Sequence, residues 1–268
     1  MTTLNREITI CGKCLMKGQT ASVKIVPSLH KGIRFYPNNS NEAIEAKVNN
    51  VISTEHCTVL GSETQQLMTI EHFMAACAIC NLDSLDVYVD TFEMPILDGS
   101  SKIWIEEFQK AGITESNHQF INISKPVFLD YGKTQIVMTP SDALKISYMV
   151  NFNHPELKNK WVSLNNIDEI KEARTFGFLK DLEAFQKAGY ALGADIDNTV
   201  GLAEEGYTTA LRSDLEPAKH KILDLIGDLY LTGVNPLHLN VNIIVKEAGH
   251  KVHVEFAKIL MQELLEEI

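Results

Sequence analysis

The chain has 268 residues, 45% of them hydrophobic, which is enough apolar material for one large domain or two ordinary ones. Its formal net charge of -11 excludes the basic surface typical of nucleic-acid-binding proteins, so we expect no nucleic-acid partner. The first residues lack the apolar region of a signal peptide, and no stretch has the length of a membrane span. The expected location is the cytoplasm, without stable membrane insertion.

Short strand-like runs separated by turns occupy the first part of the chain. Apolar and β-branched residues predict strands at 6–11, 20–26, 32–36 and 47–53. A helix is expected near residues 70–80, where Thr69 is a suitable N-terminal cap, and a strand follows at 84–90. A loop with proline and glycine, at 91–101, then leads to an amphipathic helix at 102–113.

A polar break at 114–119 is the expected linker between an N-terminal domain (1–116) and a C-terminal domain (117–268). The second half begins again with strands, and helices and further strands follow. We expect strands at 120–129, 134–140, 143–152, 195–203 and 238–246, and helices at 166–172, 178–188, 219–231 and from 250 onward. Because each half places strands before helices, the expected fold class is α+β with two domains, rather than a βαβ sheet.

The stretch "KHKILDLIGDLYL" (219–231) carries polar groups beside an apolar helix face. His220, Asp224 and Asp228 recur at i, i+4 and i+8, so they share one stripe of the predicted helix. Ionisable groups beside a core are costly unless something pairs with them. A histidine and an aspartate one turn apart are two neighbouring metal-ligand groups, although such a pair alone is more often structural.

Two Glu-His pairs are candidates to complete a catalytic metal site, which needs three protein ligands. Glu71-His72 falls in the first, exposed turn of the helix expected at 70–80. Adjacent helical residues point about 100° apart, so one can bind a metal while the other acts as a base. Glu55-His56 lies in a strand-like stretch, where neighbours point to opposite faces, and is interpreted as a partly exposed pair.

A further histidine stands at a predicted strand-to-helix junction. His250 follows Gly249 in "AGHKVH" and is therefore placed to face a cleft. Asp228 is expected to pair with His250, raise its pKa and keep it cationic near neutral pH.

The cysteines offer an alternative metal site. Four of the five form two C-x-x-C pairs, Cys11 with Cys14 and Cys77 with Cys80. Together they would make a closed structural zinc site in a non-enzymatic protein. Cys77 and Cys80 fall on an apolar helix, however, where cysteine acts as a small hydrophobe, so core cysteines are the preferred interpretation.

Four motifs together resemble one known family. "TIEHFMAACAICNLDSLDVYVDTFEMPILDGSS", "ARTFGFLKDLEAFQKAG", "KHKILDLIGDLYL" and "AGHKVH" are similar, in this order, to the motifs of the UDP-3-O-acyl-N-acetylglucosamine deacetylases of lipid A biosynthesis. The resemblance covers most of the chain. It implies two α+β domains of similar topology, each a β-sheet layered against helices, with a zinc-dependent active site between them.

The resemblance also implies roles for individual residues. The zinc ligands are expected at His72, His220 and Asp224, and the general base at Glu71. The catalytic groups further include His250, supported by Asp228, and the Thr175 hydroxyl near the oxyanion. Substrate contacts are expected at Lys221, Phe176, Lys133 and Leu179, the last beside the acyl chain.

Three positions depart from the family pattern: Met16 stands where a histidine is usual, Lys219 where arginine is usual, and His253 where asparagine is common. None of them removes a ligand. The implied reaction is hydrolysis of the N-acetyl group of an acylated UDP-sugar by a monomer, the committed step of lipid A biosynthesis. The alternatives are a zinc amidohydrolase for a different acylated amide and the cysteine-zinc protein described above.

Overall fold

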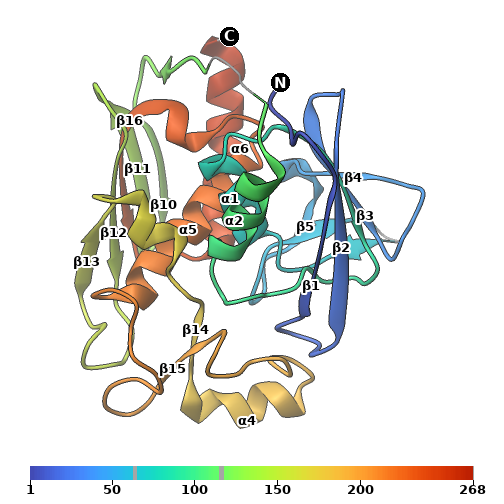
Figure 1. Cartoon of the computed structure of the whole chain (residues 1–268). Coiled ribbons are helices and arrows are strands. Elements are labelled where there is room, and N and C mark those ends of the chain that lie inside the picture. Colours follow the sequence, from blue (N-terminus) through green and yellow to red (C-terminus); the bar gives the residue numbers. More distant parts are fainter. Residues whose placement is uncertain (63–64, 115–117, 268) are drawn as a thin grey trace.

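The computed structural model describes residues 1–62, 65–114 and 118–267, so part of the expected linker, residues 115–117, lies outside it. Two β-sheets face each other across a layer of helices (Figure 1). The chain is thus of the mixed α and β type, as expected. None of the described helices is long and apolar enough to cross a membrane.

The two sheets are built on the same plan. The first has the order β1 (Ile8–Lys13), β2 (Thr20–Pro27), β8 (Ser84–Val89), β3 (Gly32–Pro37), β4 (Ile44–Glu45). The second has the order β10 (Val127–Tyr131), β11 (Thr134–Pro140), β16 (Leu239–Lys246), β12 (Lys145–Val150), β13 (Lys160–Ser163), with β9 (Ile121–Asn122) also on β16. In each, the central strand is antiparallel to one neighbour and parallel to the other. The halves therefore share a strand topology.

Four helices fill the space between the sheets (Figure 1). They are α1 (Glu71–Ile79), α2 (Lys102–Ala111), α5 (Glu216–Tyr230) and α6 (His250–Glu267). Smaller elements complete the described chain: η1 (Val48–Asn50), β5 (Val51–Ser53), β6 (Val59–Gly61), β7 (Gln66–Leu67), α3 (Ile167–Lys171), β14 (Phe176–Phe178), α4 (Leu179–Lys187), β15 (Val200–Leu202) and η2 (Pro236–His238). Helix α4 and strands β14 and β15 form one end of the molecule in Figure 1.

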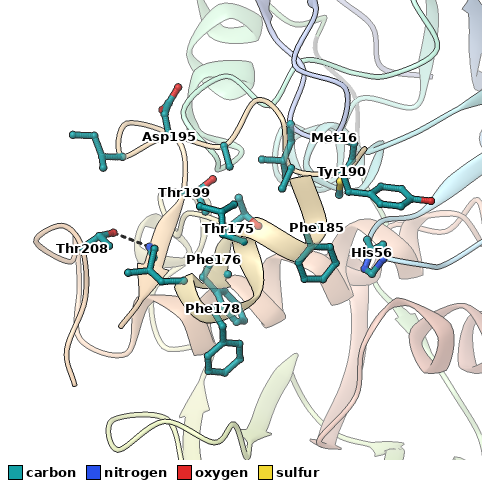
Figure 2. A pocket seen from close by; sticks show the side chains of 18 residues that line it. Met16, His56, Thr175, Phe176, Phe178, Phe185, Tyr190, Asp195, Thr199 and Thr208 are labelled. Carbon is teal, nitrogen blue, oxygen red and sulfur yellow. Dashed lines mark hydrogen bonds between the residues drawn. The ribbon is translucent and has the colours of Figure 1, made fainter. Parts of the chain in front are cut away.

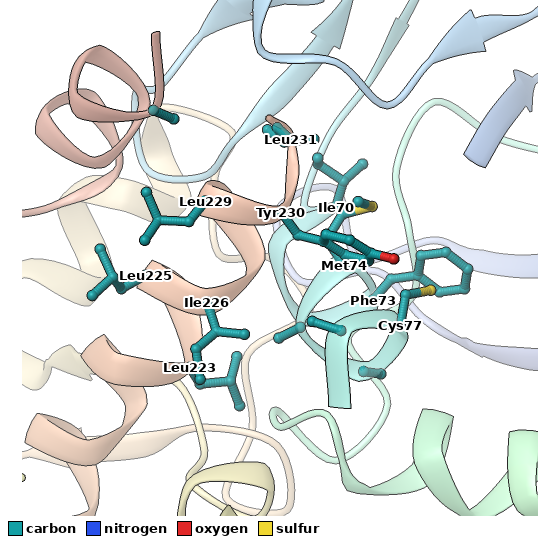
Figure 3. Packing of buried hydrophobic residues seen from close by; sticks show 14 of the residues in the cluster. Ile70, Phe73, Met74, Cys77, Leu223, Leu225, Ile226, Leu229, Tyr230 and Leu231 are labelled. Atoms are coloured by element: carbon teal, nitrogen blue, oxygen red, sulfur yellow. The ribbon is translucent and has the colours of Figure 1, made fainter. Parts of the chain in front are cut away.

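Helices α1 and α5 pack closely because both are apolar where they meet. Figure 3 shows Phe73 and Met74 of α1 beside Ile226 and Tyr230 of α5. Burying a large apolar side chain contributes about 1.5–3 kcal/mol, so this contact accounts for a substantial part of the core. A Cβ on Gly227 would lie 2.1 Å from the Glu71 carbonyl oxygen, so only glycine permits this approach.

Most predicted elements are confirmed, and several boundaries were wrong. Helix α5 begins at Glu216, three residues before the predicted start, since Pro217 is well tolerated in a first helical turn. The strand expected at 120–129 is split into β9 and β10, with Pro126 between them. Of the strand expected at 195–203, only β15 forms.

Two local predictions were wrong because the backbone turns where a regular element was expected. Thr69 has a φ of 60° and makes no cap hydrogen bond to α1. His56 has a φ of 67° and lies in a turn between β5 and β6, not in a strand. Both residues have a positive φ, a conformation that residues other than glycine seldom adopt and that local sequence patterns do not reveal.

Candidate active site

Three metal-competent side chains meet where α1 and α5 touch. His72 comes from α1, and His220 and Asp224 come from successive turns of α5. Asp224 Oδ1 lies 3.3 Å from His220 Nε2 and 3.7 Å from His72 Nε2, and all three side chains are buried. The structure thus brings together the three residues for which we predicted metal binding.

Two atoms of this cluster that can only accept, His220 Nε2 and Asp224 Oδ1, face each other without a donor between them. His220 Nδ1 lies 2.9 Å from the Ala173 carbonyl, which only accepts, so Nδ1 carries the hydrogen and Nε2 is bare. Asp224 Oδ1 has no hydrogen-bond partner among the described residues. Burial lowers the pKa of His220, and burial with the neighbouring His220 lowers the pKa of His72 to about 3. Two neutral imidazoles and a carboxylate are a typical donor set for zinc with one open position.

Glu71 lies beside the cluster and was wrongly predicted to be exposed. Glu71 and His72 are only 3% and 5% exposed, because α5 covers the first turn of α1. The backbone N–H of Thr58 donates to Glu71 Oε2 at 3.1 Å, which orients the carboxyl group. Burial raises the pKa of Glu71 to about 7, so near neutral pH it can accept or return a proton.

His250 is the first residue of α6, and its ring is anchored as predicted. Its Nδ1 lies 2.9 Å from Asp228 Oδ2, while its Nε2 lies 3.8 Å from Glu71 Oε1. Burial opposes protonation of this ring, but Asp228 and Asp224 outweigh it and raise the pKa of His250 to about 9. A cationic imidazole therefore faces the Glu71 carboxyl group across the site.

Thr58 joins these groups and was missed by the sequence analysis. Its hydroxyl donates to Asp228 Oδ1 at 2.6 Å and lies 3.3 Å from His250 Nδ1. Because its N–H binds Glu71, this one buried residue contacts Glu71, His250 and Asp228. It lies in the turn between β5 and β6, a region where we predicted a strand, and no residue pattern marked it.

The predicted substrate lysines differ in their surroundings. Lys221 Nζ lies 2.5 Å from Asp224 Oδ2, so in this structure it neutralises the cluster. Lys133 is exposed in the turn between β10 and β11. That turn lies beside the start of α6, since Thr134 Oγ1 donates to the Glu247 carbonyl at 3.1 Å.

Thr175 is held by the loop at 91–101. Its N–H donates to the Gly99 carbonyl at 2.7 Å. Gly99 has a φ of 84°, and a Cβ there would lie 1.8 Å from the Asn198 carbonyl oxygen. Asp98 forms an ion pair with Arg212 at 2.7 Å and fixes the loop further. Part of the "MPILDGSS" sequence therefore positions Thr175, the residue directly before strand β14.

An apolar cavity of about 280 Å³ adjoins this strand (Figure 2). Thr175, Phe176 and Leu179 all line it, so three residues predicted to act near the reacting group, the sugar and the acyl chain share one cavity. The remaining wall is largely apolar and is formed by residues including Leu15, Met16, Phe178, Leu182, Phe185, Tyr190 and Ile196. Phe176 also approaches the cluster of His72, His220 and Asp224, with its ring centroid 6.2 Å from that of His220.

His56 forms the partly exposed pair with Glu55 that we predicted, and it also lines this cavity. Its ring packs edge-on against Phe185 and Tyr190, with centroid distances of 4.9 and 5.1 Å (Figure 2). The positive φ of His56 turns it toward α4, which the sequence did not indicate. Glu55 remains exposed, 3.8 Å from the ring.

The cysteine site is contradicted by the structure. Among the described residues, two groups have the spacing to share a metal ion, and neither contains a cysteine: His72-His220-Asp224 and Asp228-His250-His253. Burial raises the pKa of Cys14 and Cys80 to about 12 and that of Cys77 well above its usual value, so these thiols stay protonated. Cys14 and Cys77 are core cysteines, as preferred above, whereas Cys80 is half-buried and Cys11 is exposed, so the preferred interpretation was wrong for Cys11.

A model of the UDP-3-O-acyl N-acetylglycosamine deacetylase (LpxC) family matches residues 1–262. The chain belongs to this family. A relative from Leptospira biflexa serovar Patoc, named UDP-3-O-acyl-N-acetylglucosamine deacetylase, is 35% identical over 98% of this chain and 90% of its own length. Relatives of the same name from Thermodesulfovibrio yellowstonii and a Sulfurovum species are 32% and 36% identical, over 99% and 88% of this chain and 94% and 83% of their own lengths.

Proposed function

We propose that the chain hydrolyses the N-acetyl group of UDP-3-O-[(3R)-3-hydroxyacyl]-N-acetylglucosamine, giving the glucosamine product and acetate, in a zinc-dependent reaction of lipid A biosynthesis. The observation that carries the zinc proposal is the pair of bare acceptors, His220 Nε2 and Asp224 Oδ1, facing each other at 3.3 Å in a buried cluster. The names of the relatives support the substrate. The adjoining apolar cavity supports an acyl chain.

His72, His220 and Asp224 are the proposed zinc ligands. A bound zinc ion lowers the pKa of a coordinated water to ~7 and polarises a carbonyl, which helps because amides resist uncatalysed hydrolysis. Glu71, held by the Thr58 N–H, is the proposed base that takes the proton of the attacking water. Its raised pKa lets it release that proton later in the cycle.

Two further groups are proposed to act on the charge that develops at the acetyl oxygen. The hydroxyl of Thr175 donates to the oxyanion, and the cationic His250, oriented by Asp228, stabilises it electrostatically. The leaving amine takes its proton from His250 or from Glu71. Both groups face the same space, since His250 Nε2 lies 3.8 Å from Glu71 Oε1.

Substrate binding is proposed to use both charge and apolar contact. Lys221 and Lys133 are the proposed basic contacts for the sugar and diphosphate, against a net charge of -11. Phe176 and Leu179 would contact the sugar and the acyl chain, because both line the cavity next to the metal cluster. The cavity would then exclude water from the chain while the acetyl group reacts.

We further propose the division into an N-terminal domain, 1–116, and a C-terminal domain, 117–268, with the reaction occurring between them. The repeated strand order of the two sheets supports this division. So does the origin of the proposed catalytic groups, since α1 comes from the first part of the chain and α5 and α6 from the second. Action as a monomer in the cytoplasm remains a prediction.

Metal content tests the proposed site directly. We expect about one zinc per chain by mass spectrometry in the purified protein and in the control Cys77→Ala, and its loss in His220→Ala. The reason is that His220 supplies a bare nitrogen to the cluster, whereas Cys77 lies in the core as a protonated thiol. Zinc that persists in His220→Ala and disappears in Cys77→Ala would refute the assignment.

Acyl-chain dependence tests the substrate. We expect kcat/KM for UDP-N-acetylglucosamine without the acyl chain to be more than a hundredfold lower, because four buried methylenes already correspond to about 3 kcal/mol. Phe185→Ala, which removes one wall of the cavity, should lower kcat/KM for the acylated substrate and leave the deacylated one nearly unchanged. Equal kcat/KM for both substrates in the unmodified protein would contradict the proposed use of the cavity.

A further inference from the structure

A second buried histidine, His253, lies behind His250. The two are three residues apart on α6, so they share a helix face, and both rings point to Asp228. His253 Nδ1 lies 2.9 Å from Asp228 Oδ2, the same oxygen and the same distance as for His250 Nδ1. His253 and Asp228 are both 0% exposed, so water does not compete for these hydrogen bonds.

The buried Asp228 carboxylate therefore accepts hydrogen bonds from three side chains. Thr58 Oγ1 donates to Oδ1, and the two histidines approach Oδ2. The pKa of this carboxyl is lowered to about 2, because the histidines and their hydrogen bonds outweigh the effect of burial. An ionised carboxylate has no hydrogen to give, so Nδ1 of His250 and Nδ1 of His253 both carry theirs.

The far side of the His253 ring is also anchored. Its Nε2 lies 2.8 Å from the hydroxyl of Tyr148, a fully buried residue of β12. The same hydroxyl lies 2.7 Å from the Ala248 carbonyl. Burial lowers the pKa of His253, so Nε2 of the neutral ring accepts, and the single hydroxyl hydrogen goes either to Nε2 or to the carbonyl. Ala248 stands two residues before His250, so Tyr148 lies against the backbone that carries the catalytic ring.

A hydrogen-bonded circuit results. It runs from the His250 ring through Asp228 and His253 to the Tyr148 hydroxyl, which lies beside the Ala248 carbonyl and donates its one hydrogen to His253 or to that carbonyl. It anchors the ring of one catalytic group and packs against the backbone that precedes it. Neighbours of this kind, which orient a catalytic side chain without touching substrate, typically contribute ten- to a hundredfold to activity.

We propose that His253 is a positioning residue, which holds Asp228 in the orientation from which Asp228 fixes His250, and that Tyr148 holds His253 in turn. The inference rests on the proposed role of His250 in the deacetylation. His253 makes no proposed contact with substrate, so its replacement should act on kcat and leave KM unchanged. It is also not a proposed zinc ligand, so metal content should stay constant.

Two amide variants separate positioning from packing. In His253→Asn the amide nitrogen takes nearly the place of Nδ1 and keeps a donor to Asp228, whereas in His253→Gln it extends toward the place of Nε2 and leaves Asp228 without that donor. We expect kcat for His253→Asn within about threefold of the unmodified protein, and kcat for His253→Gln lower by about ten- to a hundredfold, with unchanged KM and zinc content. Tyr148→Phe should show a smaller loss of kcat, because it removes only the contact between Tyr148 and His253 and leaves the contact between His253 and Asp228 in place.

A readout without substrate keeps this inference separate from the proposed function. In nitrogen-15 NMR spectra we expect a slowly exchanging Nδ1–H signal of His250 in the unmodified protein and in His253→Asn, and its loss by fast exchange in His253→Gln. Equal kcat and equal NMR signals in the two amide variants would overturn the positioning role. If the unmodified protein lacks deacetylase activity, the proposed function fails, and the NMR comparison alone decides whether His253 holds the circuit.

Discussion

Replacing Glu71 by glutamine should lower kcat by a hundredfold or more while zinc content stays at about one per chain. Glutamine keeps the shape of the side chain and can still accept the Thr58 N–H, but it cannot take a proton. Groups that act as general acids or bases typically contribute 10²–10⁴-fold to the rate. The experiment is steady-state kinetics on the acylated UDP-sugar, with metal analysis of the same sample.

The matched control is Glu55→Gln, which makes the same change in the other Glu-His pair. Glu55 is exposed and lies outside the metal cluster, so we expect kcat close to that of the unmodified protein. Full turnover by Glu71→Gln would show that another group is the base. Loss of zinc from Glu71→Gln would instead make Glu71 part of the metal site.

Replacing Gly227 by alanine should both destabilise the fold and remove the metal. In an ordinary helix interior this change stabilises by about 1 kcal/mol, because alanine has the higher helix propensity. Here the new Cβ would lie 2.1 Å from the Glu71 carbonyl oxygen and 2.9 Å from the carbonyl carbon. These are backbone atoms, so α1 and α5 must move apart, and overpacking of this kind typically costs about 1–3 kcal/mol.

The same separation moves His72 away from His220 and Asp224, since these residues lie on the two helices concerned. We therefore expect a Tm lower by several degrees, on the scale of about 2–4 °C per kcal/mol, together with weakened zinc binding. Gly249→Ala is the control for Tm, because a Cβ at Gly249 meets nothing within 4 Å. An unchanged Tm and full zinc content in Gly227→Ala would mean that the helices tolerate the methyl group.

The order of strands and helices was largely predictable from local patterns. Periods of two and 3.6 residues identified most strands of both sheets and the main helices, because burying one face of an element requires that spacing. The stripe of His220, Asp224 and Asp228 was visible for the same reason. The short strands β4, β6, β7, β13 and β14 were missed, since two to four residues are too few to show a period.

Several features of the site depend on residues that are distant in sequence. Thr58 reaches Asp228 across 170 positions, and Tyr148 reaches His253 across 105. His56 turns toward the cavity because its φ is positive, and no neighbouring residue in the sequence indicates that conformation. The burial of Glu71, which raises its pKa, comes from the covering helix α5 and not from its own helix.

The amino-acid sequence by itself determined the fold class, the family and the three residues proposed to bind zinc, because periodic burial and motif order are local properties of a chain. Only the tertiary structure decided which groups face one another. Gly227 illustrates the reason: glycine is required at this position only because the Glu71 backbone packs against it. Distances, tautomers and pKa values follow from such tertiary contacts between distant segments. Electrostatic and hydrogen-bond energies depend on separation in space rather than along the chain.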